Sequence, residues 1–260
     1  MSFAIFAMLF YVIALLLLSP MLVKVQTAEK FKRDKSVFLL TAFIALCLHL
    51  INLLDLSAQN GDGISIMQAS SFVSLIMALI STFAVLCRVR TLWTLLPIMY
   101  GFALINVAFA TFLPHQRLAQ HHDLFFHIVL SLVSYAVCFI AMLYSIQIYW
   151  IERRLKRKKI TFSPLMPPLM LAERHFFRVL FSGEILLTAT LISGAFVLVD
   201  YGSAHNIQKA LFTFFAWLVF GQLLIGRWKW HWNGQKMVSY CVSGMILLSI
   251  GYAISRAMLT

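Results

Sequence analysis

The chain has 260 residues, of which 62% are hydrophobic and only 12% are charged. Soluble domains contain about 45–50% apolar residues, so this composition excludes an ordinary soluble protein and indicates residence in a bilayer. The net charge of +12 lies almost wholly in alternate loops between apolar segments, which makes it a signal of membrane topology and not of nucleic-acid binding.

The first apolar segment, 3–23, resembles the hydrophobic part of a secretory signal. It lacks a basic region before it and an A-x-A-like cleavage site after it. Five lysine and arginine residues follow, from Lys24 to Lys35. We therefore expect a retained first span whose N-terminus faces outward.

Eight apolar segments are long enough to cross a bilayer. They lie at about 3–23, 37–54, 66–87, 92–113, 124–150, 177–199, 207–226 and 236–257. The first, third, fifth and seventh loops, with the adjoining span ends, hold 18 of the 21 Lys and Arg residues. Because positive charge marks cytoplasmic loops, the sequence predicts an all-α polytopic bundle of eight spans with both termini periplasmic. It also predicts one integral-membrane domain over 1–260.

Two segments carry a face of small residues, which favours close approach of a neighbouring helix. These faces are Ser70, Ser74, Ala78 and Ser81 in the third segment, and Gly244, Gly251 and Ser255 in the eighth. The fourth segment contains Pro97, which predicts a kink because proline leaves one backbone carbonyl unpaired.

The fifth segment fixes the orientation of the chain. It runs apolar from Leu124 to Trp150 and ends in a basic run at 153–159, which marks that end as cytoplasmic. A stripe of polar and small side chains follows one face of this helix and should contact other helices. The stripe consists of His127, Ser131, Ser134 and Cys138.

The longest loop, 151–176, contains the pair Pro167 and Pro168, which predicts an interfacial turn before a short amphipathic lead-in to the sixth span. Glu184 lies inside that span, where a carboxyl is costly if unpaired; we expect it to be neutral or hydrogen-bonded, or to belong to a proton path. A cluster of aromatic and basic residues at the end of the seventh span, from Arg227 to Trp232, is typical of an interfacial anchor.

Histidines near the outer face are the candidate functional residues. By helix rise, His49 lies roughly 20 Å up the second span and His127 about 5 Å below the outer surface, so both could lie at similar depth. Two neutral imidazoles can ligate a haem iron axially, although each histidine could equally be hydrogen-bonded inside the bundle. His205, in the outer loop before the seventh span, could approach the same site or be solvated.

Other chemistry has little support in the sequence. The outer-loop histidines, His115, His121 and His122, could bind a metal with Asp123 but fit a solvated loop better. Four scattered cysteines form no C-x-x-C or C-x-x-C-H motif, which argues against zinc, disulfide or covalent haem attachment. Phosphate loops, nucleophile elbows and paired carboxylates are absent from the sequence, so we expect no enzyme activity.

Ten short motifs lie along nearly the whole chain: CLH at 47–49, LLPIMY at 95–100, FALIN at 102–106, ATF at 110–112, HIVLSLVSY at 127–135, MPPL at 166–169, ER at 173–174, LLTATLISG at 186–194, AW at 216–217 and GRW at 226–228. They are similar to those of the cytochrome c assembly membrane-protein family (CcsA and HemX-like proteins), most closely its small YpjD branch. Their order and spacing together are specific.

The resemblance implies an all-helical bacterial inner-membrane protein that binds or handles haem b in c-type cytochrome biogenesis, together with other biogenesis proteins. His127 matches the first of the family's outer histidines, with His49 or His205 as the other ligand. The second family histidine usually precedes a lysine, and that position here is Gln208. The tryptophan-rich outer loop of full haem-handling members is also absent, since residues 200–206 contain no tryptophan.

Two alternatives remain. The first is a non-enzymatic accessory or regulatory subunit of another membrane complex, without bound haem, which docks through its basic inner loops and the Pro167–Pro168 turn. The second is a transporter. Transporters often have interrupted helices at matching places in two halves, whereas the interruption at Pro97 and Gly101 has no counterpart here.

Overall fold

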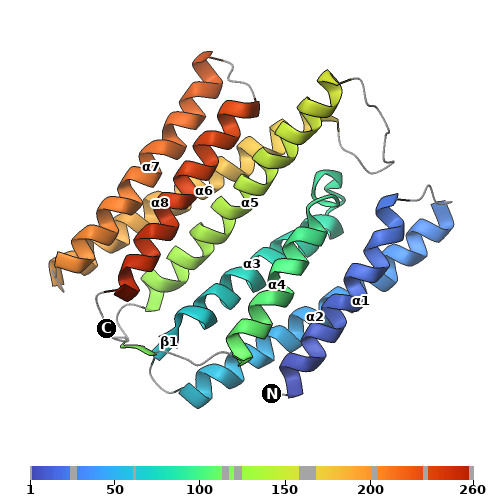
Figure 1. Cartoon of the computed structure of the whole chain (residues 1–260), viewed down its shortest axis with the longest axis horizontal. Coiled ribbons are helices and arrows are strands. Elements are labelled where there is room, and N and C mark those ends of the chain that lie inside the picture. The colour runs from blue at the N-terminus through green and yellow to red at the C-terminus, as the bar shows by residue number, and fades with distance from the viewer. Residues whose placement is uncertain are drawn as a thin grey trace. The chain divides into compact units, whose positions relative to one another are not determined.

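The computed structural model describes residues 2–23, 28–60, 63–112, 117–119, 125–157, 168–200, 204–230 and 234–257. Within these ranges the chain forms eight α-helices (Figure 1). They are α1 (Ser2–Val23), α2 (Ala28–Asn60), α3 (Ile66–Leu86), α4 (Leu96–Phe112), α5 (Phe125–Lys156), α6 (Leu169–Asp200), α7 (Ala204–Trp230) and α8 (Gly234–Ala257).

The predicted all-α fold class is confirmed, because each of the eight predicted segments corresponds to one helix. Among the described residues, six helices are long and apolar enough to cross a membrane: α1, α2, α3, α5, α6 and α7. The apolar helix α4 is shorter, with 17 residues. At ~1.5 Å per residue it measures about 26 Å, slightly less than a ~30 Å hydrocarbon core.

Several helix boundaries differ from those predicted. α2 begins at Ala28 instead of 37, because Glu29, Lys30 and Lys32 are good helix formers that continue the helix beyond its apolar part. α6 begins at Leu169 instead of 177, so the predicted lead-in is continuous with the span. His205 lies in the first turn of α7 and not in a loop.

The prediction of a kink at Pro97 was wrong. α4 begins only at Leu96, which places Pro97 in the first helical turn. A proline there removes no hydrogen bond within the helix, because the first N–H groups have no intrahelical acceptor. The preceding residues Arg90–Leu92 form a short 3₁₀ helix, η1. A two-stranded antiparallel ribbon was also not predicted; in it β1 (Gly63–Ser65) pairs with β2 (Arg117–Ala119).

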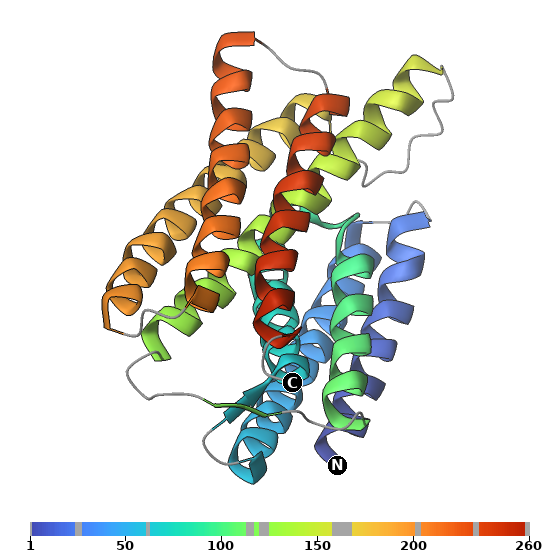
Figure 2. The same cartoon turned by 60° about the vertical axis from the view of Figure 1, so that its left-hand side comes forward.

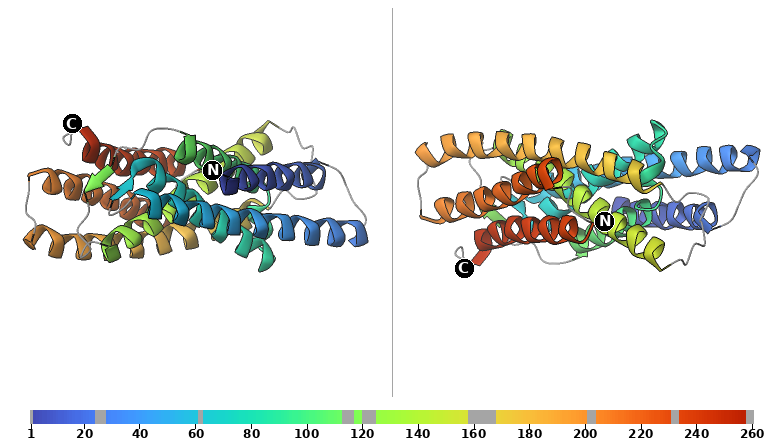
Figure 3. Two further views of the ribbon diagram at one scale, coloured as in Figure 1. Left: turned by 90° about the horizontal axis from the view of Figure 1, so that it is seen from below. Right: turned by 90° about the horizontal axis from the view of Figure 1, so that it is seen from above.

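The helices group into two compact units, each described here by itself. The first contains α1 to α4 with the ribbon, and the second contains α5 to α8. In the first, α1 packs along α2; in the second, α7 packs along α8 and α5 along α6 (Figures 2 and 3). Sequence neighbours are therefore neighbours in space within each unit.

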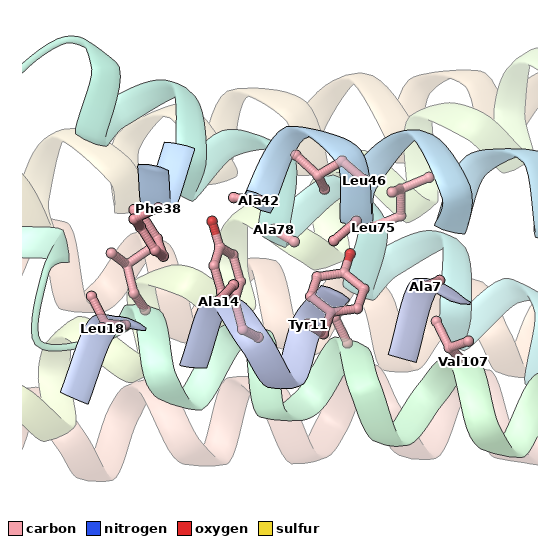
Figure 4. Packing of buried hydrophobic residues seen from close by; sticks show 14 of the residues in the cluster. Ala7, Tyr11, Ala14, Leu18, Phe38, Ala42, Leu46, Leu75, Ala78 and Val107 are labelled. Carbon is pink, nitrogen blue, oxygen red and sulfur yellow. The ribbon is translucent and has the colours of Figure 1, made fainter. Parts of the chain in front are cut away.

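The core of the first unit is built on one stripe of α1. Its buried residues recur at helical spacing, and three of the six are alanines: Ala4, Ala7, Tyr11, Ala14, Leu18 and Met21. Figure 4 shows four of them, Ala7, Tyr11, Ala14 and Leu18, spaced along the helix. The intervening Phe3, Leu9 and Leu16 are exposed, as expected for side chains that face lipid.

The predicted small-residue face of α3 is confirmed as a packing face. Ser74, Ala78 and Ser81 are fully buried, and the Ser70 hydroxyl donates a hydrogen bond to Oδ1 of Asn106 on α4. The corresponding face of α8 packs on α7. A Cβ on Gly244 would lie 2.7 Å from Cζ of Phe220, so a larger residue there would displace the Phe220 ring.

The C-terminus of α3 ends in a Schellman motif. The Val89 N–H donates to the Ala84 carbonyl at 2.9 Å and the Arg88 N–H donates to the Val85 carbonyl at 3.1 Å. Arg88 has φ 64°, the left-handed conformation that this motif requires and that glycine usually supplies. The Lys35 ammonium, from α2, donates to the same Val85 carbonyl at 3.1 Å.

In the second unit, polar contacts join helices at the end where α5 and α7 finish and α6 and α8 begin. The Glu152 carboxylate accepts from the Gly234 N–H at 3.1 Å and from the Lys156 ammonium at 2.7 Å, which joins α5 to α8. The Arg227 guanidinium lies 3.0 Å from the Glu173 carboxylate, which joins α7 to α6. These contacts satisfy helix-terminal groups and complement the helix dipoles.

Candidate functional site

His127 lies in the first turn of α5, at the opposite end of the second unit from these polar contacts. Its Nδ1 atom is 2.8 Å from the Ser193 hydroxyl, which α6 presents across the α5–α6 interface. The imidazole is partly buried. The contact is possible because the antiparallel pair brings the start of α5 beside the last third of α6.

The hydrogen bonds of Ser193 determine the tautomer of His127. Ser193 donates its single hydroxyl hydrogen to the Thr190 carbonyl at 3.0 Å. The Ser193 oxygen therefore accepts from Nδ1–H of His127, and the Nε2 lone pair of the neutral ring stays available. No residue in the described part of the chain hydrogen-bonds to Nε2. An orienting hydrogen bond on one ring nitrogen, with the other open, is the usual arrangement of a metal-ligating histidine.

Gly194, the next residue of α6, lies close to the same ring. A Cβ at this position would lie 3.2 Å from Cε1 of His127 and 3.9 Å from each ring nitrogen. That approach is tighter than an ordinary van der Waals contact, so a side chain at 194 would move the ring. The Ser193–Gly194 pair thus fixes both the tautomer and the position of the imidazole.

α7 brings positive charge and the third candidate histidine to the same unit. Lys209 is half-buried and lies close enough to His127 to act on it electrostatically. His205 lies one helical turn earlier on α7, and its side chain is outside the described residues. The cation beside an open imidazole suits a ligand that carries carboxylates.

His49 is in a different environment, inside the first unit. It is fully buried on α2; its Nδ1 atom is 3.0 Å from the Tyr11 hydroxyl and its Nε2 atom is 2.8 Å from the Ser71 hydroxyl. A neutral imidazole has one N–H and one lone pair, and both are used in this arrangement. His49 can ligate a metal only if one of these hydrogen bonds is broken.

The structure thus brings His127 and the first turn of α7 into one unit, while His49 belongs to the other. The outer-loop histidines His115, His121 and His122 lie outside the described residues, as do His231 and Trp232 of the predicted anchor. Within that anchor, Trp228 is 82% exposed, as a side chain at the lipid interface should be.

Sequence reasoning missed Ser193, Gly194 and Tyr11. Ser193 and Gly194 end the family-like motif LLTATLISG, so their position in a motif was the available signal. Tyr11 lies in an apolar run with nothing to mark it, and only the packing of α1 on α2 brings it to His49.

Comparison with known proteins identifies the family of the chain. The chain matches the family model described as cytochrome C assembly protein over residues 1–260. It is 38% identical over 260 residues to "Inner membrane protein YpjD" of Escherichia coli strain K12, which covers 98% of this chain and 96% of that protein. An uncharacterized 28.8 kDa protein of Azospirillum brasilense is 29% identical over 175 residues, 63% of this chain and 64% of that protein. No solved structure matches.

The long apolar helices define a multi-pass helical membrane protein. The chain belongs to the cytochrome c assembly protein family. It is a protein of the inner membrane, as the similarity to the Escherichia coli inner-membrane protein and the apolar helices together indicate.

Proposed function

We propose that this protein binds haem b non-covalently through His127 and handles it during the assembly of c-type cytochromes. One observation carries the proposal: Ser193 holds His127 in the tautomer whose Nε2 lone pair is available. The imidazole is the axial ligand that haem proteins use most widely. Membership of the cytochrome c assembly family supports haem as the group bound.

Haem, when bound, supplies a redox-active iron, and the protein's residues hold and orient it. His127 would ligate the iron through Nε2, and Lys209 would place its positive charge beside the haem carboxylates. His205, in the first turn of α7, is the candidate for a second haem ligand within the same unit. The two hydrogen bonds of His49 make that residue a structural group in this proposal.

We further propose that all eight helices cross the inner membrane, with both termini and the His127 end of α5 facing the periplasm. The distribution of lysine and arginine supports this orientation, since the α5 end at Arg153, Arg154 and Arg157 is basic and exposed. In this topology the haem site opens where c-type cytochromes are assembled. The proposed role is binding and transfer of haem, without catalysis.

A haem-free accessory subunit is the second candidate function. Two observations favour it: Gln208 stands where family members carry a histidine before lysine, and residues 200–206 contain no tryptophan. In this alternative the exposed basic end of α5 would be the docking surface for a partner complex.

Absorption spectra of the purified protein, oxidised and dithionite-reduced, test the proposal. Protein from haem-replete cells should show low-spin haem bands. These should be lost in His127→Ala and kept in His175→Ala, a matched variant near the other end of α6. A colourless wild type would favour the accessory-subunit function, and unchanged bands in His127→Ala would exclude His127 as a ligand.

A further inference from the structure

A carboxyl group lies in the middle of α6, far from both ends of the helix. Glu184 is half-buried, and its Oε2 atom is fully buried without a hydrogen-bond partner among the described residues. None of the ion pairs in the described part of the chain includes it. An ionised carboxylate in a bilayer without a counter-charge is very costly, so this group needs another way to be satisfied.

The neighbouring helices give the carboxyl room but no charge. On α7, a Cβ at Gly221 would lie 3.2 Å from Oε1 of Glu184 and would meet no other atom within 4 Å. On α5, the buried Cys138 thiol is close enough to Glu184 to interact with it electrostatically, and it interacts in the same way with the buried Cys241 of α8. A glycine opposite the carboxyl leaves space that a larger side chain would fill.

The Ser134 hydroxyl lies beside the same thiol, since Ser134 precedes Cys138 by one turn of α5 and interacts with its sulfur. Apart from that thiol, the buried Ser134 oxygen has no hydrogen-bond partner in the part of the chain that the structure describes. The helices are close here, since a Cβ on Gly183 would lie 3.1 Å from the Cys138 sulfur. Buried polar atoms are rarely left unpaired, and a proton together with an ordered water would satisfy both oxygens.

We propose that Glu184 is a proton-binding site inside the membrane, which holds its proton at neutral pH and shares one buried water with Ser134. The carboxylic O–H donates to the water, and the water donates to the Ser134 oxygen. Gly221 provides the space for the carboxyl. This site is separate from the haem site and requires no haem.

Infrared spectroscopy of the purified protein in lipid nanodiscs at neutral pH tests the proton. The wild type should show the carbonyl stretch of a protonated carboxylic acid, shifted in deuterated buffer, and Glu184→Gln should lack it. Glu173→Gln is the matched control, because Glu173 lies on the same helix but is paired with Arg227. In Ser134→Ala the band should shift as the shared water is lost. An unshifted band in Ser134→Ala would exclude a water shared between Glu184 and Ser134. Absence of the band from the wild type would exclude Glu184 as a proton-binding site.

A hydrophobic carbodiimide gives an independent readout that needs only the wild type. The reagent takes the carboxylic proton on one nitrogen while the carboxylate oxygen bonds to its central carbon, and the adduct rearranges to a stable N-acylurea. Peptide mass spectrometry should locate the label at Glu184. No label there would overturn the proposal, and protection by sodium or potassium ions would assign the carboxyl to a metal cation instead.

These measurements separate this inference from the proposed function. A colourless protein with a protonated Glu184 would reject haem binding and keep the proton site. A haem-containing protein without the carboxylic acid band or the carbodiimide label would support haem binding and reject the proton site.

Discussion

Nδ1 of His127 lies 2.8 Å from Oγ of Ser193, a residue 66 positions further along the chain, and this contact decides which ring nitrogen can bind a ligand. The same hydroxyl is committed to the Thr190 carbonyl, so it cannot donate to the ring. Four substitutions test this contact, the packing of the His127 ring, the role of His49 and the backbone strain at Arg88.

Ser193→Ala should weaken haem binding. Without the acceptor, the Nδ1–H loses its orienting partner, and loss of such a contact typically lowers metal affinity about 10- to 100-fold. Haem titration of the apoprotein, followed by absorbance, measures the change. Ser182→Ala is the control, because Ser182 is exposed on the same helix and, among the described residues, its hydroxyl bonds only to the Val179 carbonyl. Equal affinities for the two variants would mean that Ser193 does not orient the ligand.

Gly194→Ala should disturb the haem spectrum without unfolding the protein. Its Cβ would lie 3.2 Å from Cε1 of His127, so the imidazole must move by a few tenths of an ångström. The bands should shift or weaken, while thermal unfolding stays close to that of the wild type. Gly101→Ala is the matched control, since its Cβ would meet nothing within 4 Å. Identical spectra for both variants would show that a Cβ at position 194 does not displace the His127 ring.

His49→Leu separates a structural role from a ligand role. The change leaves the buried Tyr11 and Ser71 hydroxyls without their partner, at a cost of about 1–3 kcal/mol for each buried group left unpaired. We expect unfolding at a lower temperature, with haem retained per folded molecule. Tyr11→Phe, which removes only one of the two contacts, should have a smaller effect. Loss of haem from folded His49→Leu would instead make His49 a ligand.

Arg88→Gly should stabilise the protein. Arg88 has φ 64°, where a side chain costs about 1 kcal/mol relative to glycine. Thermal unfolding in detergent should therefore move upward. Arg88→Ala removes the same charge but keeps the strained conformation, so it should give no gain. A destabilised Arg88→Gly would show that the arginine side chain makes a contact worth more than the strain.

The sequence predicts the helices well because their apolar runs are long and separated by charged loops. The eight segments and the small faces of α3 and α8 follow from composition and helical period alone. The starts of α2 and α6 did not follow, because charged residues continue a helix past its apolar part as readily as they end it.

The site was predicted in part. The histidines stand out as polar residues in apolar segments. Helical periodicity shows which face of a helix a residue occupies, but it does not show which residue of another helix it contacts. From the sequence, His49 and His127 are equivalent candidates. In the structure the His49 ring makes two hydrogen bonds, whereas the His127 ring makes one among the described residues. Glu184 was recognised as costly, but its space opposite Gly221 depends on how α6 packs on α7.

The carboxylate contacts of the second unit lie at the end away from His127, where Glu152 joins α5 to α8 and Glu173 joins α6 to α7. Hydrogen bonds join the same two pairs of helices further along, between Tyr135 and Ser249 and between Trp217 and Thr188. Each of these helix pairs is therefore held by polar contacts at two levels. Loss of Glu152 or Glu173 alone leaves the second contact of its pair in place.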